Sequence, residues 1–296
     1  MKYTFILFFL MFSAAVFPQQ KTQILQQKID SIFAKNQGDY ALAFKDLSEE
    51  KRTILIDEHE DFHAASTMKT PVMIEVFKQA EAGKFSLDDS LTVKNEFKSI
   101  YDGSSFSLDL NRDSGEHLYS QLGKKRSIKD LVIDMISQSS NLATNIIIEL
   151  VDAENVNKSM RELGAKNINV LRGVEDMKAY DAGMNNSTTA YDLMLIFEAL
   201  ANGKAVSPEA DKEMLEILRL QLHTDLIPAL LPKDLKIANK TGWITGVHHD
   251  SALVELPDGG SYVLVLLSKN MEDMEGGTEM LAGISKMIYD LMIDNP

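Results

Sequence analysis

The chain has 296 residues, of which 45% are hydrophobic, and its formal net charge is −14 at pH 7. This acidic excess argues against a nucleic-acid partner, because nucleic-acid binding requires basic patches. The sequence contains no cysteine, which excludes disulfides and thiolate metal sites. About 275 residues follow a short apolar leader, enough for one compact body of one or two lobes.

The first 20 residues have the pattern of a cleaved secretory signal peptide. Lys2 precedes an apolar run over residues 3–17, which includes the small residues Ser13–Ala15. A membrane anchor is the alternative, but the run is shorter than the ~20 apolar residues that a spanning helix needs. No cysteine follows that could carry a lipid. We therefore expect residues 1–20 to direct export to the periplasm or beyond, with no stable membrane anchor.

The first two thirds of the remaining chain are predicted to form one helix, then two strands, then several further helices. Apolar residues at helical spacing predict a helix over residues 22–35. Two apolar segments around a polar turn predict strands over residues 40–44 and 52–56. Further helical patterns span residues 71–82, 127–138, 189–202 and 208–221.

The C-terminal part returns to strands. Predicted strands over residues 235–238, 249–256 and 262–267 precede an amphipathic helix over residues 279–293. Strands therefore occur near both ends of the chain, with helices between them. We expect the two ends to combine into one α/β lobe, into which the helical middle is inserted.

Three short motifs occur in order along this chain. They are Ser66–Lys69 (Ser-Thr-Met-Lys), Ser139–Asn141 (Ser-Ser-Asn) and Lys240–Gly242 (Lys-Thr-Gly). Alone, the first is typical of a helix cap with a solvated lysine, the second of a loop or cap, and the third of a strand end. Together, in this order and at these separations, they are typical of a serine that is acylated with help from a lysine.

The spacing of the first motif suits nucleophilic catalysis. A free serine hydroxyl is a poor nucleophile and needs an adjacent base. If Ser66 opens a helix, Lys69 lies one turn later on the same face. A lysine acts as a base only where burial and nearby positive charge lower its pKa, and Lys240 can supply that charge. The N–H groups at the helix start would suit an oxyanion formed at Ser66.

On these motifs the sequence resembles the class A β-lactamases and the wider penicillin-binding-protein superfamily, which carry S-x-x-K, S-D-N and K-T-G. The resemblance covers about residues 22–295. It implies an α/β (α+β) fold with an antiparallel sheet flanked by helices and an inserted all-helical lobe. One catalytic domain over residues 21–296 is expected. Its α/β lobe would comprise about residues 21–61 and 205–296, and its helical lobe about residues 62–204.

The resemblance also implies the roles of the motif residues. Ser66 would be the nucleophile, Lys69 its activating base, and Ser139 the relay that passes a proton to the departing nitrogen. Lys240 and Thr241 would bind the substrate carboxylate. The implied substrate-binding residues are Asn141, Lys240, Thr241, Gly242 and Trp243.

The resemblance implies specific substrate contacts for Asn141 and Trp243. Asn141 would bind the side-chain amide of the substrate. The backbone N–H of Trp243 would be the second oxyanion donor beside that of Ser66. The indole of Trp243 can line the site, and a packing role is the alternative.

Hydrolysis also requires release of the acyl group. In the family a glutamate lies two residues after an arginine, with an asparagine four residues after the glutamate. Here Glu175 comes three residues after Arg172, and Ala179 stands where the asparagine is expected. Glu175 is therefore the candidate deacylation base, with Asp176 in reserve. A structural surface carboxylate is the alternative interpretation.

No cofactor and no metal are expected. His248 and His249 are adjacent, so in a strand their side chains point to opposite faces. The expected substrate is a small-molecule β-lactam or a peptidoglycan-like peptide, and the expected state is a monomer. The expected activity is that of a class A-like serine β-lactamase, an amide hydrolase. Two alternatives remain: a penicillin-binding D-Ala-D-Ala peptidase-like hydrolase with slow deacylation, or an inactive binding domain.

Overall fold

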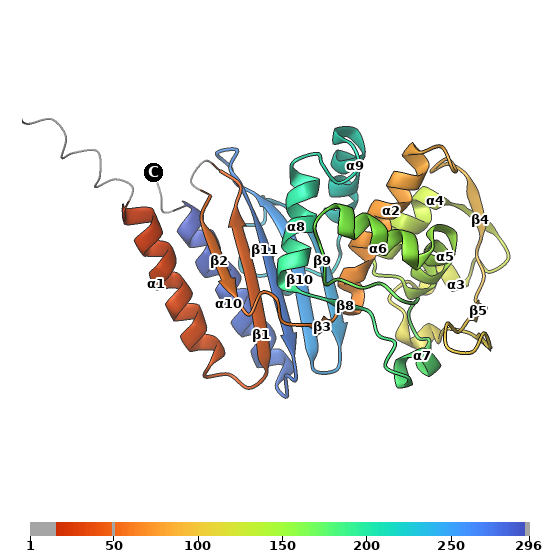
Figure 1. The fold of residues 1–296 in the computed structure, drawn as a ribbon, viewed down its shortest axis with the longest axis horizontal. Coiled ribbons are helices and arrows are strands. Elements are labelled where there is room, and N and C mark those ends of the chain that lie inside the picture. The colour runs from red at the N-terminus through yellow and green to blue at the C-terminus, as the bar shows by residue number, and fades with distance from the viewer. Residues whose placement is uncertain (1–15, 49–50, 294–296) are drawn as a thin grey trace, which may run out of the picture.

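The computed structural model describes residues 16–48 and 51–293, so the predicted leader over residues 1–20 lies largely outside the described residues. In the described part of the chain, no helix is long and apolar enough to cross a membrane. The chain forms an α+β structure around a five-stranded antiparallel sheet (Figure 1). The predicted fold class is therefore confirmed.

The sheet joins the two ends of the chain. Its strands lie in the order β2 (Thr53–Ile56), β1 (Asp39–Asp46), β11 (Ser261–Lys269), β10 (Val247–Glu255) and β9 (Lys236–Ile244). Strand β1 pairs with β11 in a register that places Leu42 opposite Leu266. The N-terminal hairpin therefore continues a sheet whose other three strands come from the C-terminal part, and β9 forms an edge.

Long helices cover both faces of this sheet (Figure 1). They are α1 (Val16–Phe33) and α10 (Met274–Ile293) on one face and α8 (Ala190–Ala201) on the other. Strand β1 shows how the sequence separates the two faces. Its Leu42 and Phe44 belong to the core under α1 and α10, whereas Ala41 and Ala43 belong to the core on the α8 side. This alternation follows from the two-residue period of a strand.

A second group of helices packs around α2. This group consists of α2 (Lys69–Glu81), α4 (Ile128–Ser137), α5 (Asn141–Val151), α6 (Ala153–Glu162) and α9 (Pro208–Leu218). Ten of the thirteen residues of α2 are buried, because other helices surround it on most sides. The 3-10 turn η1 (Ala65–Met68) leads directly into α2 and lies against the edge strand β9.

Short elements connect the longer ones. They are β3 (Phe62–His63) paired with β8 (Ser187–Thr188), β4 (Ser90–Thr92) with β7 (Lys125–Ser127), β5 (Phe97–Lys98) with β6 (Ser105–Phe106), and the turns η2 (Leu110–Arg112), α3 (Glu116–Tyr119) and α7 (Met177–Asp181).

Several element boundaries differ from the sequence prediction: helix α1 begins at Val16 instead of residue 22, and strand β9 continues to Ile244 instead of ending at residue 238. Helix α10 begins at Met274, five residues before the predicted start. The prediction begins later because Gly277 lies in this stretch. Glycine disfavours a helix, but a Cβ at Gly277 would lie 2.6 Å from the sulfur of Met271, so a larger residue there would have to displace the Met271 side chain. Helix α8 belongs in sequence to the predicted helical lobe, yet it packs on the sheet. The division into lobes stays a prediction.

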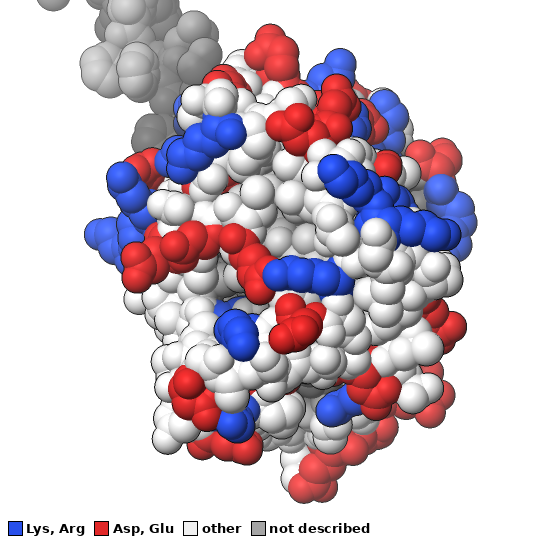
Figure 2. Space-filling view, turned by 90° about the vertical axis from the view of Figure 1, so that its right-hand side faces the viewer, with Lys and Arg blue, Asp and Glu red and all other residues white. Residues whose placement is uncertain are grey.

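Charges of both signs are interspersed on the face of the molecule that carries the helical group (Figure 2). Ion pairs link different elements there, among them Lys94 with Glu149 and Lys129 with Glu213. Exposed pairs of this kind contribute little stability each. The net charge of −14 is therefore not concentrated in one acidic patch on this face.

Candidate active site

The three motifs meet where the helical group contacts the edge of the sheet. Ser66 lies in η1 and Lys69 opens α2. Ser139 lies in the turn between α4 and α5. Lys240 lies in the middle of β9, whose pairing with β10 continues for three more residues beyond Thr241. The third motif is therefore part of a long edge strand, and the strand end that it would mark in isolation is not present.

The segment before Ser66 has an unusual backbone. Ala65 has a φ of 45°, in the left-handed region that is uncommon for residues with a side chain. Its N–H donates to Nδ1 of His63, at 3.0 Å. Such strain persists where the surroundings impose it, and it is frequent at functional sites. It turns the chain sharply immediately before Ser66.

Ser66 and Lys69 lie one helical turn apart, as the spacing predicts. Ser66 is half-buried, and within the described residues its hydroxyl has no hydrogen-bond partner. Lys69 is fully buried. No hydrogen bond joins the two side chains in this state. Catalytic hydrogen bonds are often long before substrate binds, so the geometry is compatible with proton transfer between the two residues.

The ammonium of Lys69 has three acceptors, all from the second motif. It donates to the carbonyl oxygen of Ser139 at 2.7 Å, to Oγ of Ser139 at 3.2 Å and to Oδ1 of Asn141 at 3.1 Å. Burial lowers the pKa of Lys69 to about 7, although the carboxylates of Asp113 and Glu175 act to raise it. An ordinary lysine has a pKa of about 10.4. At neutral pH a large fraction of Lys69 is therefore uncharged and able to accept a proton.

A second buried lysine approaches the same hydroxyl. Lys240 donates to Oγ of Ser139 at 3.0 Å and to the carbonyl oxygen of Thr241 at 3.0 Å. Burial lowers the pKa of Lys240 well below its usual value, and the nearby charge of Lys69 lowers it further, while Asp250 acts to raise it. Ser139 Oγ thus lies between two buried amino groups, which is a suitable place for a hydroxyl that passes protons.

The edge strand passes unusually close to the backbone of the first motif. A Cβ on Gly242 would lie 3.0 Å from the backbone nitrogen of Ser66 and 3.1 Å from Cβ of Ala65. Only glycine therefore fits without displacing η1. The next residue, Trp243, has a side chain that is 62% exposed. Its indole does not pack in the core, so the packing alternative for this residue finds no support.

The loop after Arg172 directs Glu175 toward the motifs. Glu175 accepts hydrogen bonds from Nδ2 of Asn141 at 3.2 Å and from the backbone N–H of Asp109 at 3.1 Å. Its backbone is left-handed, with a φ of 60°. Asn145 fixes the preceding residue, Val174, through hydrogen bonds to both its N–H and its carbonyl.

The neighbouring carboxylate has a different environment. Asp176 is 2% exposed and accepts hydrogen bonds from Oγ of Ser99 at 2.7 Å and from the N–H of Ile100 at 2.9 Å. It also caps α7 through the N–H of Ala179. Asp176 therefore holds the loop in place, while Glu175 is the carboxylate that contacts the second motif.

One residue of the site has no motif of its own in the sequence. Asp113 is 5% exposed and accepts hydrogen bonds from the backbone N–H groups of Asn141 and Leu142. The only sequence signal for it is indirect: the second position of the second motif is Ser140, where the family has an aspartate.

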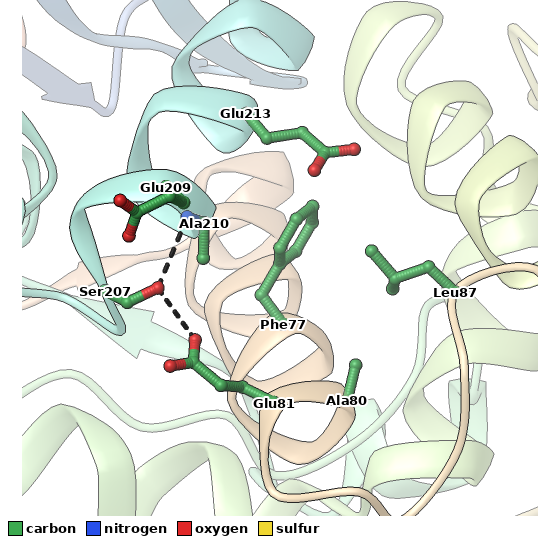
Figure 3. A pocket seen from close by; sticks show the side chains of 8 residues that line it. All are labelled: Phe77, Ala80, Glu81, Leu87, Ser207, Glu209, Ala210 and Glu213. Atoms are coloured by element: carbon green, nitrogen blue, oxygen red, sulfur yellow. Dashed lines mark hydrogen bonds between the residues drawn. The ribbon is translucent and has the colours of Figure 1, made fainter.

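A separate cavity of about 400 Å³ lies between α2 and α9 (Figure 3). Phe77 and Leu87 line it together with glutamates. Two of those carboxylates already have partners, since Glu81 accepts from Ser207 and Glu213 pairs with Lys129. None of the three motifs contributes to this cavity.

Comparisons with known proteins agree with the site. A sequence model of the beta-lactamase enzyme family matches residues 23–292, so the chain belongs to this family. This membership supports the hydrolysis of β-lactams. A beta-lactamase of Bacteroides uniformis is 23% identical, and the match covers 99% of this chain and 100% of that protein.

Solved structures show the same fold. The structure of PBP-A is 27% identical with a TM-score of 0.79, and the match covers 92% of this chain and 96% of that chain. A variant of PBP-A, solved as an acyl-enzyme complex with penicillin G, has a TM-score of 0.77. A beta-lactamase of Sphaerobacter thermophilus is 26% identical with a TM-score of 0.79, over 92% of this chain and 97% of that chain.

Proposed function

We propose that the protein is an exported, class A-like serine β-lactamase that opens the ring of penicillins and cephalosporins through an ester on Ser66. The observation that carries this proposal is the position of Ser139 Oγ between two buried lysines, 3.2 Å from Nζ of Lys69 and 3.0 Å from Nζ of Lys240. Two amino groups with lowered pKa values supply a route for protons between nucleophile and leaving group.

Acylation begins with neutral Lys69. Its amine takes the proton of Ser66, and Oγ attacks the carbonyl carbon of the β-lactam. The developing oxyanion accepts hydrogen bonds from the backbone N–H groups of Ser66 and Trp243. The C–N bond then breaks, and the departing nitrogen receives a proton through Ser139. Lys69, protonated in the first step, can resupply Ser139 through their hydrogen bond.

Deacylation requires a second base. Glu175 lies beside Asn141, which in turn contacts Lys69. In this position its carboxylate can hold a water molecule and take its proton as the water attacks the ester carbonyl. The proton that Glu175 took from the water then returns to the Ser66 oxygen as the ester bond breaks, so Ser66, Lys69 and Glu175 all regain their starting protonation.

The substrate carboxylate would bind at the third motif. The hydroxyl of Thr241 has no hydrogen-bond partner within the described part of the chain. The ammonium of Lys240 is fully buried behind it. Thr241 would therefore contact the carboxylate directly. The bound carboxylate would favour the protonated form of Lys240, whose charge then attracts it. Asn141 would bind the side-chain amide.

A penicillin-binding hydrolase with slow deacylation is the second candidate. Two observations favour it: Ala179 stands where the family has an asparagine, and Glu175 already accepts two hydrogen bonds. Such a carboxylate is less available to a water molecule. The same acylation machinery would then form a long-lived ester.

Pre-steady-state kinetics with a chromogenic cephalosporin separate the two candidates. The proposed function predicts continued turnover after any initial burst, with product exceeding enzyme many times over. A burst of one equivalent followed by silence would replace it with the slow-deacylation function. No colour change and no covalent adduct would indicate a binding domain.

A further inference from the structure

The second motif lacks the carboxylate that the family carries at its middle position. Ser140 stands there, and it is fully buried. Its Oγ caps α5 by accepting from the N–H of Ala143 at 3.2 Å. A serine can cap a helix as well as an aspartate does. It brings no charge, so the negative charge at the start of α5 has to come from another residue.

Asp113 supplies this charge from a different segment. It lies between η2 and α3, 27 residues before Ser140. Its Oδ1 accepts from the N–H groups of Asn141 at 2.9 Å and Gly115 at 2.8 Å. Its Oδ2 accepts from the N–H of Leu142 at 2.8 Å.

Two hydroxyl groups complete this shell. Oδ2 of Asp113 also accepts from Oη of Tyr119 at 3.1 Å and from Oγ of Ser140 at 3.4 Å. Within the described residues no salt bridge reaches this carboxylate. Its charge is balanced by the N-terminus of α5, where backbone N–H groups favour an anion.

The approach of the two segments requires Gly115. A Cβ at this position would lie 2.4 Å from both Cβ and Oγ of Ser140. The stretch Asp113–Gly115 is therefore fitted to the second motif at backbone level. A fit this close fixes Asp113 relative to Ser140.

We propose that Asp113 is a positioning residue that takes the place of the missing aspartate of the second motif and holds Ser139 and Asn141 against Lys69. This inference rests on the proposed function. Asn141 is the link: its backbone N–H is held by Asp113, and its side chain contacts both Lys69 and Glu175.

Asp113 also acts on Lys69 through its charge. Burial lowers the pKa of Lys69, and three charged groups face this lysine: Asp113, Glu175 and Lys240. The two carboxylates raise the pKa, with Asp113 the larger of the two. Removing the charge of Asp113 therefore lowers the pKa of Lys69. Acylation requires neutral Lys69, so the acid limb of its pH–rate profile, where the rate falls as Lys69 becomes protonated, moves to lower pH.

Moving the carboxylate from position 113 to position 140 tests the inference. Asp113→Ser removes the acceptor of three backbone N–H groups, and Ser140→Asp places a second carboxylate about 3.4 Å from the first. Each single variant should slow labelling of Ser66 by a fluorescent penicillin at least about tenfold. The double variant carries one carboxylate again and should recover most of that loss. A double variant no faster than either single variant would overturn the inference.

The variant Asp113→Asn provides a second test, because it nearly preserves shape. We expect its acylation rate to fall and the midpoint of its acid limb to move to lower pH than in the parent. Asp88→Asn, at an exposed site in a loop, is the control and should change neither quantity. A lower rate with an unmoved midpoint, or a parent-like rate, would contradict the positioning role. A parent protein that penicillin does not label at Ser66 would instead overturn the proposed function.

Discussion

Two fully buried lysines share one serine hydroxyl in this protein, and this arrangement opposes the charged form of both. Lys69 and Lys240 converge on Ser139, and both have pKa values below those of lysines in water. Carboxylates stand nearby but do not form salt bridges with either amine in the described residues. The result is a lysine, Lys69, that can exchange a proton at neutral pH.

Glu175 is predicted to act in deacylation and not in acylation. Glu175→Gln keeps an acceptor for Asn141 but cannot take a proton from water. The first turnover should proceed at the parent rate, and the adduct on Ser66 should then persist, with deacylation slowed by about 10²–10⁴-fold. Quenched-flow mass spectrometry measures both steps. Glu209→Gln, at an exposed position on α9, is the matched control. Turnover of Glu175→Gln at the parent rate would make Glu175 a structural residue.

The second prediction concerns Lys240 and the substrate carboxylate. Lys240→Ala also removes a partner of Ser139, so every substrate should lose acylation rate. Substrates with the free carboxylate should lose about 10–100-fold more than their methyl esters, the range expected for one charge-assisted hydrogen bond. The ratio of kcat/KM for each acid and ester pair isolates this effect. Equal losses for acid and ester would show that Lys240 does not recognise the carboxylate.

At the scale of elements, the site depends on one edge strand lying against one helix start. Strand β9 is the edge strand of the sheet, and η1 packs against it and against its neighbour β10. The contact is at backbone level because Gly242 has no side chain. This contact brings the backbone N–H groups of Ser66 and Trp243 close to each other.

Replacing this glycine should therefore disturb the oxyanion site without removing a functional group. Gly242→Ala places a methyl group against the Ser66 nitrogen, and we expect acylation to slow by about 10–100-fold, less than the about 10²–10³-fold expected for complete loss of one oxyanion donor. Gly283→Ala, on α10 with open space around its Cβ position, is the control and should keep the parent rate. Stopped-flow acylation measures both variants. A parent-like rate for Gly242→Ala would refute the proposed close approach.

Sequence patterns predicted the elements well where apolar periodicity was clear. The predicted helix over residues 127–138 corresponds to Ile128–Ser137. Helix α5 was not predicted by itself, because its run Ile146–Ile148 consists of β-branched residues that fit a strand as well as a buried helix. Strands from both chain ends share one sheet, as expected, but their order and register depend on tertiary pairing.

The candidate site was predictable to the extent that its residues carry motifs. The resemblance of the three motifs to the family identifies Ser66, Lys69, Ser139 and Lys240, and the structure brings these residues together in space. The orientation of Glu175 depends on a left-handed backbone and on a clamp by a distant asparagine, which no local pattern encodes. For the same reason Asp113 could not be identified: its partners in the second motif and at the start of α5 lie 27 to 29 residues away.

At the scale of the whole molecule, a buried histidine connects the sheet with the segment before the nucleophile. His249 on β10 donates through Nε2 to the carbonyl oxygen of His63 at 2.9 Å and accepts through Nδ1 from the N–H of Ser268 at 3.1 Å. These bonds require the neutral ring with its proton on Nε2. Burial lowers the pKa of His249 to about 3.

This histidine predicts a pH dependence of stability. Between pH 6.5 and 3 the unfolded chain binds a proton at His249 that the folded protein does not bind. The contribution of His249 to the stability of the folded protein therefore falls as pH falls. From pH 7.5 to 5 this loss amounts to about 2 kcal/mol. His249→Asn destabilises the protein at pH 7.5, but the difference from the parent should shrink by about that amount at pH 5. Urea unfolding at both pH values measures it, and an unchanged difference would contradict the account.

Time-resolved mass spectrometry of the protein mixed with a penicillin tests the central claim most directly. The account predicts an adduct with the mass of the intact penicillin, located by peptide mapping on Ser66, which forms and then disappears as hydrolysed product accumulates. Ser66→Ala should form no adduct and release no product above the uncatalysed rate. An adduct on the Ser66→Ala variant, or hydrolysis by that variant at the parent rate, would contradict the claim that Ser66 is the nucleophile.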